Sequence, residues 1–260
     1  MTWQTLDLRT DPRGVARLVL NIPDRRNVLS PVMISELTEA ARQLGSDPAV
    51  RVVVLSGAGP VFCAGGDLDW MAAQIDADRP QRLREARKLA EMLRALNELP
   101  KPLIGRLHGG AFGGGVGMAC VCDVAIAAQR TRFCFSETRL GIIPATIGPY
   151  VLARMGEGRA RRVFMSARLF EAAEAEALGL VARVVDEADL DAAVEAEVAP
   201  YLSCAPLAVA SAKALARALG PRIDDAVIDD SIRRLADAWE GPEAIVGIRA
   251  FLDKRPAPWQ

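Results

Sequence analysis

Short apolar runs alternate with amphipathic segments along the chain, and this alternation predicts strands and helices in turn. Ser30 and Pro31 have the residue types of an N-cap and a first helical position, so a helix is expected from there to about Leu44. Apolar residues recur at helical spacing over residues 81–98. Runs of strand length lie at residues 3–9, 15–21, 52–55, 103–107 and 123–127. The alternation favours an α/β fold.

The pattern becomes wholly helical from about residue 200. Two apolar stripes at helical spacing lie there, one at Ile228, Ile232, Leu235 and Trp239 and the other at Ile245, Ile248 and Leu252. Such faces need partners against which to be buried. We therefore predict two units, an α/β core over residues 1–200 and a helical region over residues 201–260.

Composition narrows the function classes. The chain has 260 residues, 51% of them apolar, which is enough for one sizeable core. A formal net charge of −1 gives no basic field for nucleic acid or a membrane surface. The first residues lack a basic-then-apolar leader and no apolar run has membrane-spanning length, so a cytoplasmic protein is expected.

The cysteines predict neither disulfides nor a metal site. Their number is odd and most lie in apolar runs, which is typical of reduced, buried thiols; they are Cys63, Cys120, Cys122, Cys134 and Cys204. The only close pair has no histidine neighbours, so packing is favoured over metal binding. The single histidine, His108, lies at a strand end without a catalytic serine or cysteine pattern, which favours a structural role.

Candidate chemistry begins with six glycines among the nine residues from Gly109 to Gly117. Such density indicates a close approach of backbone to a ligand, and the following segment 118–122 is expected to form a short buried helix. A phosphate loop would need a lysine here, and the glycine spacing does not fit a dinucleotide fingerprint. An oxyanion hole, built from backbone N–H groups, and tight helix–sheet packing remain as alternatives.

A second loop follows the predicted strand 52–55. Ala64, Gly65 and Gly66 are small enough to let a ligand reach the main chain. Asp67 has the position of an N-cap before a helix that starts at Leu68. An oxyanion hole needs donors from two segments, and this loop supplies the second candidate.

These two loops resemble those of the enoyl-CoA hydratase/isomerase (crotonase) superfamily. The resemblance extends over nearly the whole chain, through segments 21–29, 99–102, 133–144 and 251–256. It implies a spiral of βαβ units with a C-terminal helical trimerisation region, a fold that periodicity alone does not select. It also implies an acyl-CoA thioester as substrate, no cofactor apart from the coenzyme A of that substrate, and a homotrimer or hexamer.

The resemblance also implies roles for individual residues. The oxyanion donors would be the backbone N–H groups of Ala64 and Gly114, and Glu137 would be catalytic. A first catalytic glutamate belongs at position 117, where this chain has Gly117. Substrate or coenzyme A contacts are expected from Arg25, Arg26, Cys63, Ala64, Gly65, Gly66, Asp67, Leu68, Phe112, Gly113, Gly114, Pro144, Phe251 and Lys254.

One carboxylate leaves two reactions open. It can activate water and return the proton to the α-carbon, which is hydration, or move a proton between two carbons, which is isomerisation. The lost charge at position 117 would spare an acyl carboxylate from repulsion, with Arg139 as a candidate partner. Segments 112–117, 141–151 and 254–260 resemble bacterial methylglutaconyl-CoA and carboxygeranoyl-CoA hydratases. We therefore expect hydration of a branched, carboxylated enoyl-CoA, with isomerisation or non-catalytic CoA-thioester or RNA binding as alternatives.

Overall fold

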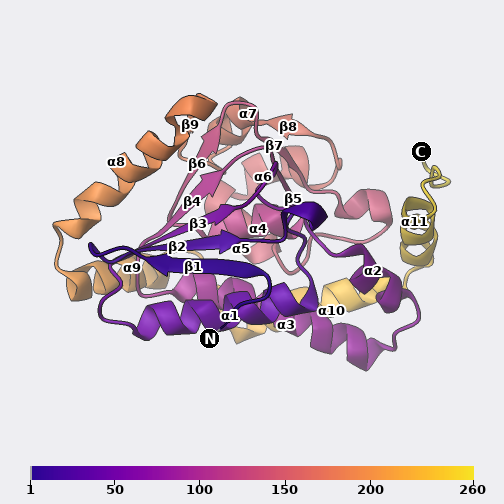
Figure 1. Cartoon of the computed structure of the whole chain (residues 1–260). Coiled ribbons are helices and arrows are strands. Elements are labelled where there is room, and N and C mark those ends of the chain that lie inside the picture. Colours follow the sequence, from indigo (N-terminus) through magenta and orange to yellow (C-terminus); the bar gives the residue numbers. More distant parts are fainter. Residues whose placement is uncertain (1) are drawn as a thin grey trace.

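The computed structural model describes residues 2–260 and is built on a six-stranded sheet (Figure 1). Its strands are, in spatial order, β1 (Leu6–Thr10), β2 (Val15–Leu20), β3 (Val52–Gly57), β4 (Leu103–Leu107), β6 (Val124–Ala128) and β9 (Arg183–Val185). Only β1 and β2 pair antiparallel, through a turn in which Gly14 has a φ of +85°. The other neighbours are parallel, so both faces of the sheet are covered.

A second sheet makes the chain wind as a spiral. It consists of β5 (Gly110–Phe112), β7 (Arg132–Cys134) and β8 (Phe170–Glu171). Along the chain β4 is followed by β5 and β6 by β7, so each turn supplies one strand to the main sheet and one to the small sheet. The expected α/β spiral is confirmed.

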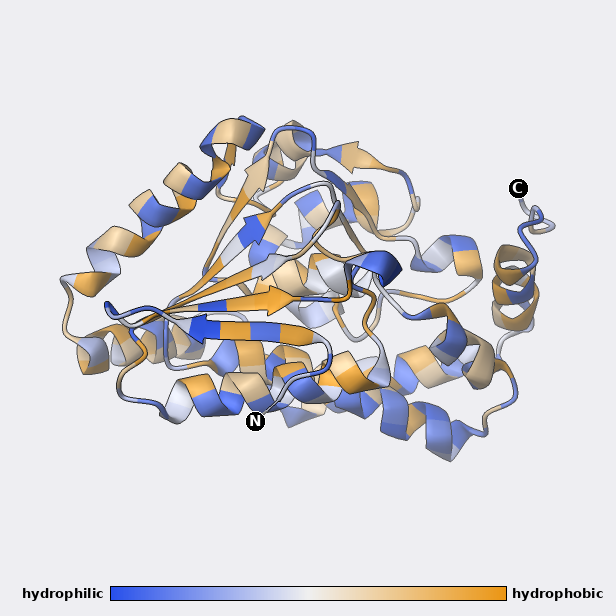
Figure 2. Cartoon of the chain, viewed as in Figure 1, coloured by the Kyte–Doolittle hydropathy of each residue, from blue (hydrophilic) through white to orange (hydrophobic). Residues whose placement is uncertain are grey.

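Helices cover the sheets as the amphipathic pattern predicts. Ser30 caps α1 by accepting a hydrogen bond from the Met33 N–H at 3.2 Å, and Asp78 caps α3 in the same way. The helices are α1 (Pro31–Ser46), α2 (Leu68–Ile75), α3 (Arg79–Glu98), α4 (Gly114–Val121), α5 (Gly148–Met155), α6 (Glu157–Phe164), α7 (Ala172–Ala177), α8 (Leu190–Leu202), α9 (Pro206–Leu219), α10 (Asp225–Glu240) and α11 (Pro242–Leu252). Three short 3₁₀ segments complete the described elements: η1 (Pro23–Arg25), η2 (Glu137–Leu140) and η3 (Glu187–Asp189). Figure 2 shows a mostly apolar β3 in the main sheet, a β1 of alternating polarity and helices of mixed polarity.

The core lies on both faces of the main sheet. The larger cluster packs α1, α3 and α4 on one face, and a smaller cluster packs α8 on the other. Four of the five thiols are buried and all are free; burial raises the pKa of Cys63 and Cys120 to about 12, which makes these thiols poor nucleophiles. Cys204 is exposed.

The C-terminal helices α10 and α11 pack against elements from the first part of the chain. Ile228, Ile232 and Trp239 of α10 are buried in a cluster with α3, which confirms the first apolar stripe. Helix α11 contacts α2 and η2, the 3₁₀ segment that begins with Glu137. Helices α10 and α11 thus pack on elements from the first 200 residues. This packing does not test the boundary at residue 200, which stays a prediction.

Among the α-helices of residues 2–260, α9 is the least covered. It contains no buried residue, and Leu207 and Leu219 are 82% and 81% exposed. Among residues 2–260 no single helix is long and apolar enough to cross a membrane; segment 187–202 and α9 pass that test only as a pair, bent by 107°.

Candidate active site

The two glycine-containing loops lie directly against each other. Cys63 and Ala111 form an isolated parallel bridge, in which the Phe112 N–H donates to the Cys63 carbonyl at 3.0 Å. Gly65 has a φ of +88°, and a Cβ there would lie 2.7 Å from the Phe112 carbonyl oxygen. Only glycine allows this approach. Segments about fifty residues apart in the sequence are thereby joined into one site.

The glycine loop offers a free backbone donor. Gly113, with a φ of +49°, precedes α4, and Gly114 is the first residue of that helix. The Gly114 N–H donates no hydrogen bond among residues 2–260, and Gly113 and Gly114 both line a cavity. An unpaired N–H at the start of a helix, on the positive end of the helix dipole, suits a developing negative charge.

The Ala64 amide differs from the expectation. Its N–H donates to the Arg26 carbonyl at 2.9 Å, and Ala64 does not line the cavity, whereas Gly66 does. Arg26 has a left-handed φ of +53°, which places its carbonyl there. Of the two predicted oxyanion donors, only the Gly114 amide is therefore free among residues 2–260, and Ala64 becomes available only by giving up its bond to Arg26.

Glu137 is the candidate for acid–base chemistry at this site. The residue is half-buried, but its Oε2 is shut off from solvent and has no hydrogen-bond partner among residues 2–260. Its Oε1 lies beside Gly113, 3.0 Å from where a Cβ on that glycine would be. Desolvation raises the pKa of the Glu137 carboxyl to about 7. A carboxyl with this pKa exchanges protons readily near neutral pH.

The cavity beside Glu137 is small and mostly apolar. Its volume is about 90 Å³. Pro144, one of the predicted binding residues, lines it together with Trp70 and Met71. The remaining lining residues are Leu29, Ile34, Gly66, Glu85, Ala86, Leu89, Gly113, Gly114, Ser136, Glu137, Leu140, Ile142, Ile143, Thr146, Ile147, Leu235 and Trp239. The site is thus a mostly apolar pocket whose lining includes the Glu137 carboxyl and the residue with the free amide, Gly114.

No carboxylate fits at position 117. Gly117 is buried in α4, and a Cβ built there would lie 3.0 Å from the Ile147 Cβ and closer still to its Cγ2. Real Cβ atoms essentially never come as close to another atom as this Cβ would come to the Ile147 Cγ2. Ile147, itself only 2% exposed, fills the space of the missing side chain.

Two predicted binding residues already have partners. Asp67 is buried and accepts hydrogen bonds from the Asp69 and Trp70 N–H groups, so its N-cap role is confirmed. Arg25 bridges Asp67 at 2.9 Å and Asp69 at 2.7 Å. The Asp67 and Arg25 side chains thus stabilise the start of α2. Any contact of either side chain with a substrate would form in addition to these bonds.

Other predicted residues lie outside the cavity lining. Leu68 is 44% exposed and Phe251 48% exposed, and both are on the surface. Arg26 and Lys254 are exposed as well, whereas Cys63 is buried and Phe112 is half-buried. Their contacts to coenzyme A stay predictions.

Two further candidates have structural contacts. The Arg139 guanidinium donates to the Ala167 carbonyl at 2.8 Å and does not line the cavity. His108 Nε2 lies 2.8 Å from the Gly59 carbonyl oxygen, so the imidazole ties two loops together.

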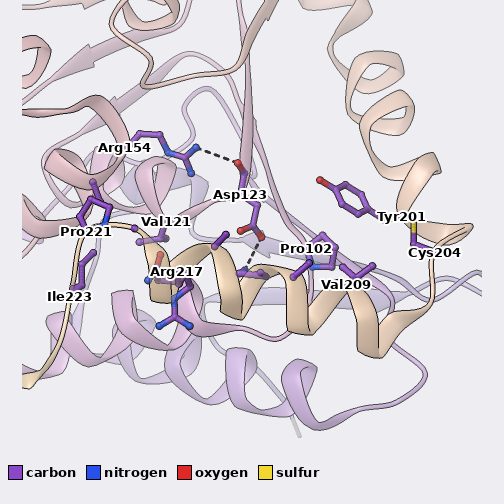
Figure 3. A pocket seen from close by; sticks show the side chains of 16 residues that line it. Pro102, Val121, Asp123, Arg154, Tyr201, Cys204, Val209, Arg217, Pro221 and Ile223 are labelled. Carbon is purple, nitrogen blue, oxygen red and sulfur yellow. Dashed lines mark hydrogen bonds and ion pairs between the residues drawn. The ribbon is translucent and has the colours of Figure 1, made fainter.

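A larger cavity of about 590 Å³ lies apart from Glu137, against α9 (Figure 3). Lys213 pairs there with Asp123 at 2.7 Å, and desolvation lowers the pKa of this lysine. Arg154 donates to backbone carbonyls at the end of α4, including those of Cys120 and Asp123. The charged groups that Figure 3 shows facing one another are therefore already paired.

Sequence reasoning missed Glu85 and Ile147. Glu85 lies in a strongly charged helix, where no local signal separates it from its neighbours. Ile147 matters only through its contact with Gly117, thirty positions earlier, which requires the packing of α4 against α5.

Comparisons with known proteins agree with this geometry. Residues 10–260 match the model of the enoyl-CoA hydratase/isomerase family. An enoyl-CoA hydratase of Alternaria alternata is 31% identical over 241 residues, which is 92% of this chain and 78% of that protein. The structure of an enoyl-CoA hydratase from Shewanella pealeana is 36% identical with a TM-score of 0.81, covering 99% of this chain and 96% of that one. Pseudomonas aeruginosa AtuE is 39% identical with a TM-score of 0.79, covering 98% and 99%. The chain belongs to the enoyl-CoA hydratase/isomerase family.

Proposed function

We propose that this protein is a hydro-lyase that adds water to the double bond of a 2-enoyl-CoA thioester. One observation carries the proposal: the Glu137 carboxyl, whose Oε2 is buried and has no partner among residues 2–260, lines the same mostly apolar cavity as the free Gly114 amide. The activity named for the Alternaria and Shewanella relatives supports it. We further propose that no separate cofactor is needed, because coenzyme A arrives as part of the substrate.

The Gly114 amide would stabilise the reacting thioester. When its carbonyl oxygen accepts the Gly114 N–H, the negative charge that develops on this oxygen meets the N-terminus of α4. The loss of one such donor typically costs about 3 kcal/mol of barrier. Ala64 would add a second donor if substrate binding displaces the Arg26 carbonyl from its N–H.

Glu137 would carry out both proton transfers. Its carboxylate takes a proton from water while the water oxygen forms a bond to the β-carbon and the electron pair of the double bond moves onto the thioester. The same carboxyl then gives that proton to the α-carbon, which restores the thioester and completes the addition of one water. A pKa of about 7 suits both steps, since the group must accept and release a proton in each cycle.

Isomerisation is the second candidate. The packing of Ile147 against Gly117 leaves Glu137 without a second carboxylate from position 117 to orient water. A single carboxylate is sufficient to move a proton between the two carbons that flank a shifting double bond. Non-catalytic binding of CoA thioesters or RNA is the alternative of another class.

The acyl group and the assembly are also matters of proposal. The resemblance of segments 112–117 and 141–151 supports a branched acyl chain with a distal carboxylate. The cavity lining opposes the carboxylate, because it contains neither lysine nor arginine among residues 2–260. Self-association as a trimer or hexamer has support from the exposed leucines of α9, Leu207, Leu215 and Leu219.

The test of this proposal measures both the mass of the product and the conjugation of the thioester. Purified protein is incubated with a 2-enoyl-CoA and, separately, with a 3-enoyl-CoA, while the absorbance of the conjugated thioester and the product mass are measured. A gain of one water by the 2-enoyl-CoA is the expected result. A shifted double bond at constant mass would establish isomerisation in its place, and no reaction with either thioester would overturn the proposal.

A further inference from the structure

A second carboxylate lines the cavity, to which α2, α3 and α10 all contribute residues. Glu85 of α3 is part of the lining together with Met71, Leu235 and Trp239. Its side chain is 19% exposed. The Trp70 indole N–H donates to its Oε2 at 3.4 Å, which holds the carboxylate against the cavity wall.

The nearby cations are directed elsewhere. Among residues 2–260, Glu85 and Glu137 are the only charged side chains that line the cavity. Lys88 pairs with the Glu85 Oε1 at 2.7 Å, but its side chain is 57% exposed and lies outside the lining. Arg82 donates to the Gln74 carbonyl and stacks over the ring of Trp239. An anion in the cavity would therefore find no cation in contact with it.

This lining treats charged and uncharged acyl chains differently. A carboxylate that entered the cavity would lose its hydration with little compensation. It would also meet the negative charge of Glu85. An uncharged chain would instead bury apolar surface against Ile142, Leu235 and Trp239.

We infer that this pocket selects uncharged acyl groups and rejects those with a distal carboxylate, with Glu85 as a residue that determines this specificity. The inference rests on the proposed function, in so far as the cavity holds the acyl chain of a CoA thioester. It concerns binding and not the reaction, so it is testable with thioesters that do not react.

Hexanoyl-CoA and adipoyl-CoA are a matched pair, because both are saturated six-carbon thioesters and differ in a terminal methyl group or carboxylate. Calorimetry of the full-length protein should give a dissociation constant at least about tenfold larger for adipoyl-CoA. The near-isosteric variant Glu85→Gln should reduce this ratio by about threefold or more. Glu91→Gln is the matched control, since Glu91 lies on the same helix and outside the cavity, paired with Arg87 and Arg94.

Equal or tighter binding of adipoyl-CoA by the unmodified protein would overturn the inference, as would an unchanged ratio in Glu85→Gln. The two proposals fail separately. A protein that binds hexanoyl-CoA selectively but hydrates no enoyl-CoA leaves the inference standing and removes the proposed function. A protein that hydrates an enoyl-CoA but binds both saturated thioesters equally removes the inference and leaves the proposed function standing. No binding of either thioester would overturn the inference, whereas the proposed function fails only if no enoyl-CoA is hydrated.

Discussion

Ile147 occupies the space into which a side chain at position 117 would project. A Cβ built on Gly117 lies 3.0 Å from the Ile147 Cβ, and Leu93 closes the same space from another side. Both positions are buried. Packing thus fills the place of a glutamate at position 117, which leaves Glu137 as the carboxyl beside the glycine loop.

Replacing Gly117 by glutamate should therefore destabilise the protein without improving hydration. The new side chain must displace Ile147 in a packed interior, which typically costs about 1–3 kcal/mol. Urea unfolding measures this cost. The substitution Ile147→Ala opens this space. The double variant with Gly117→Glu and Ile147→Ala should therefore be more stable, by at least about 1 kcal/mol, than the sum of the two single effects predicts. Additive effects of the two substitutions would contradict the packing explanation.

Glu137→Gln should lower kcat by about 10²–10⁴-fold, because the amide cannot exchange the proton. The affinity for a CoA thioester should stay within about tenfold of the original, since the amide has nearly the same shape. Steady-state kinetics and calorimetry separate the two effects. Glu157→Gln on the surface of α6 is the control and should behave as the unmodified protein. Activity near the original level in Glu137→Gln would exclude the assigned role.

The activity should rise with pH through about 7. Burial raises the pKa of Glu137 to about 7, and the carboxyl must be ionised to accept the first proton. The measurement is kcat/KM against pH with a substrate that does not titrate in this range. A profile that is flat between about pH 5 and pH 9 would show that another group limits the reaction.

The same buried carboxyl makes stability depend on pH. The pKa of Glu137 is about 7 in the folded protein and 4.5 in its ordinary state, so the folded state holds this proton more tightly. Its contribution to stability is therefore lost as pH rises from about 4.5 to 7, and a shift of this size corresponds to about 3 kcal/mol. Glu137→Gln should gain stability relative to the unmodified protein as pH rises through this window. A difference in Tm that does not change with pH would contradict the burial of the ionised form.

Gly65→Ala should separate the two loops. The φ of +88° and the Phe112 carbonyl, 2.7 Å from the new Cβ, both oppose alanine. We expect a loss of about 1–3 kcal/mol of stability and at least a tenfold loss of kcat/KM, because Gly114 and Glu137 depend on this contact. Gly158→Ala is the matched control, since a Cβ there meets nothing within 4 Å. Equal effects of the two substitutions would show that the contact between the loops is unimportant.

Local sequence patterns were sufficient for most elements. The N-caps Ser30 and Asp67, the amphipathic helix near residues 81–98 and the stripe that ends at Trp239 depend on neighbours within a few turns, so their residue types alone predicted them. The helix after the glycine loop begins at Gly114, four residues before the predicted Met118, because glycines give no helical signal.

The sequence by itself determined the candidates for the chemistry: two small-residue loops, one glutamate at position 137 and none at position 117. The tertiary structure alone decided how these groups are placed and which partners they have. It placed Ile147 against Gly117, gave the Ala64 amide to the Arg26 carbonyl and put Glu85 in the wall of the cavity. The reason is physical, because burial, clashes and the availability of a donor depend on distances between residues far apart in the chain.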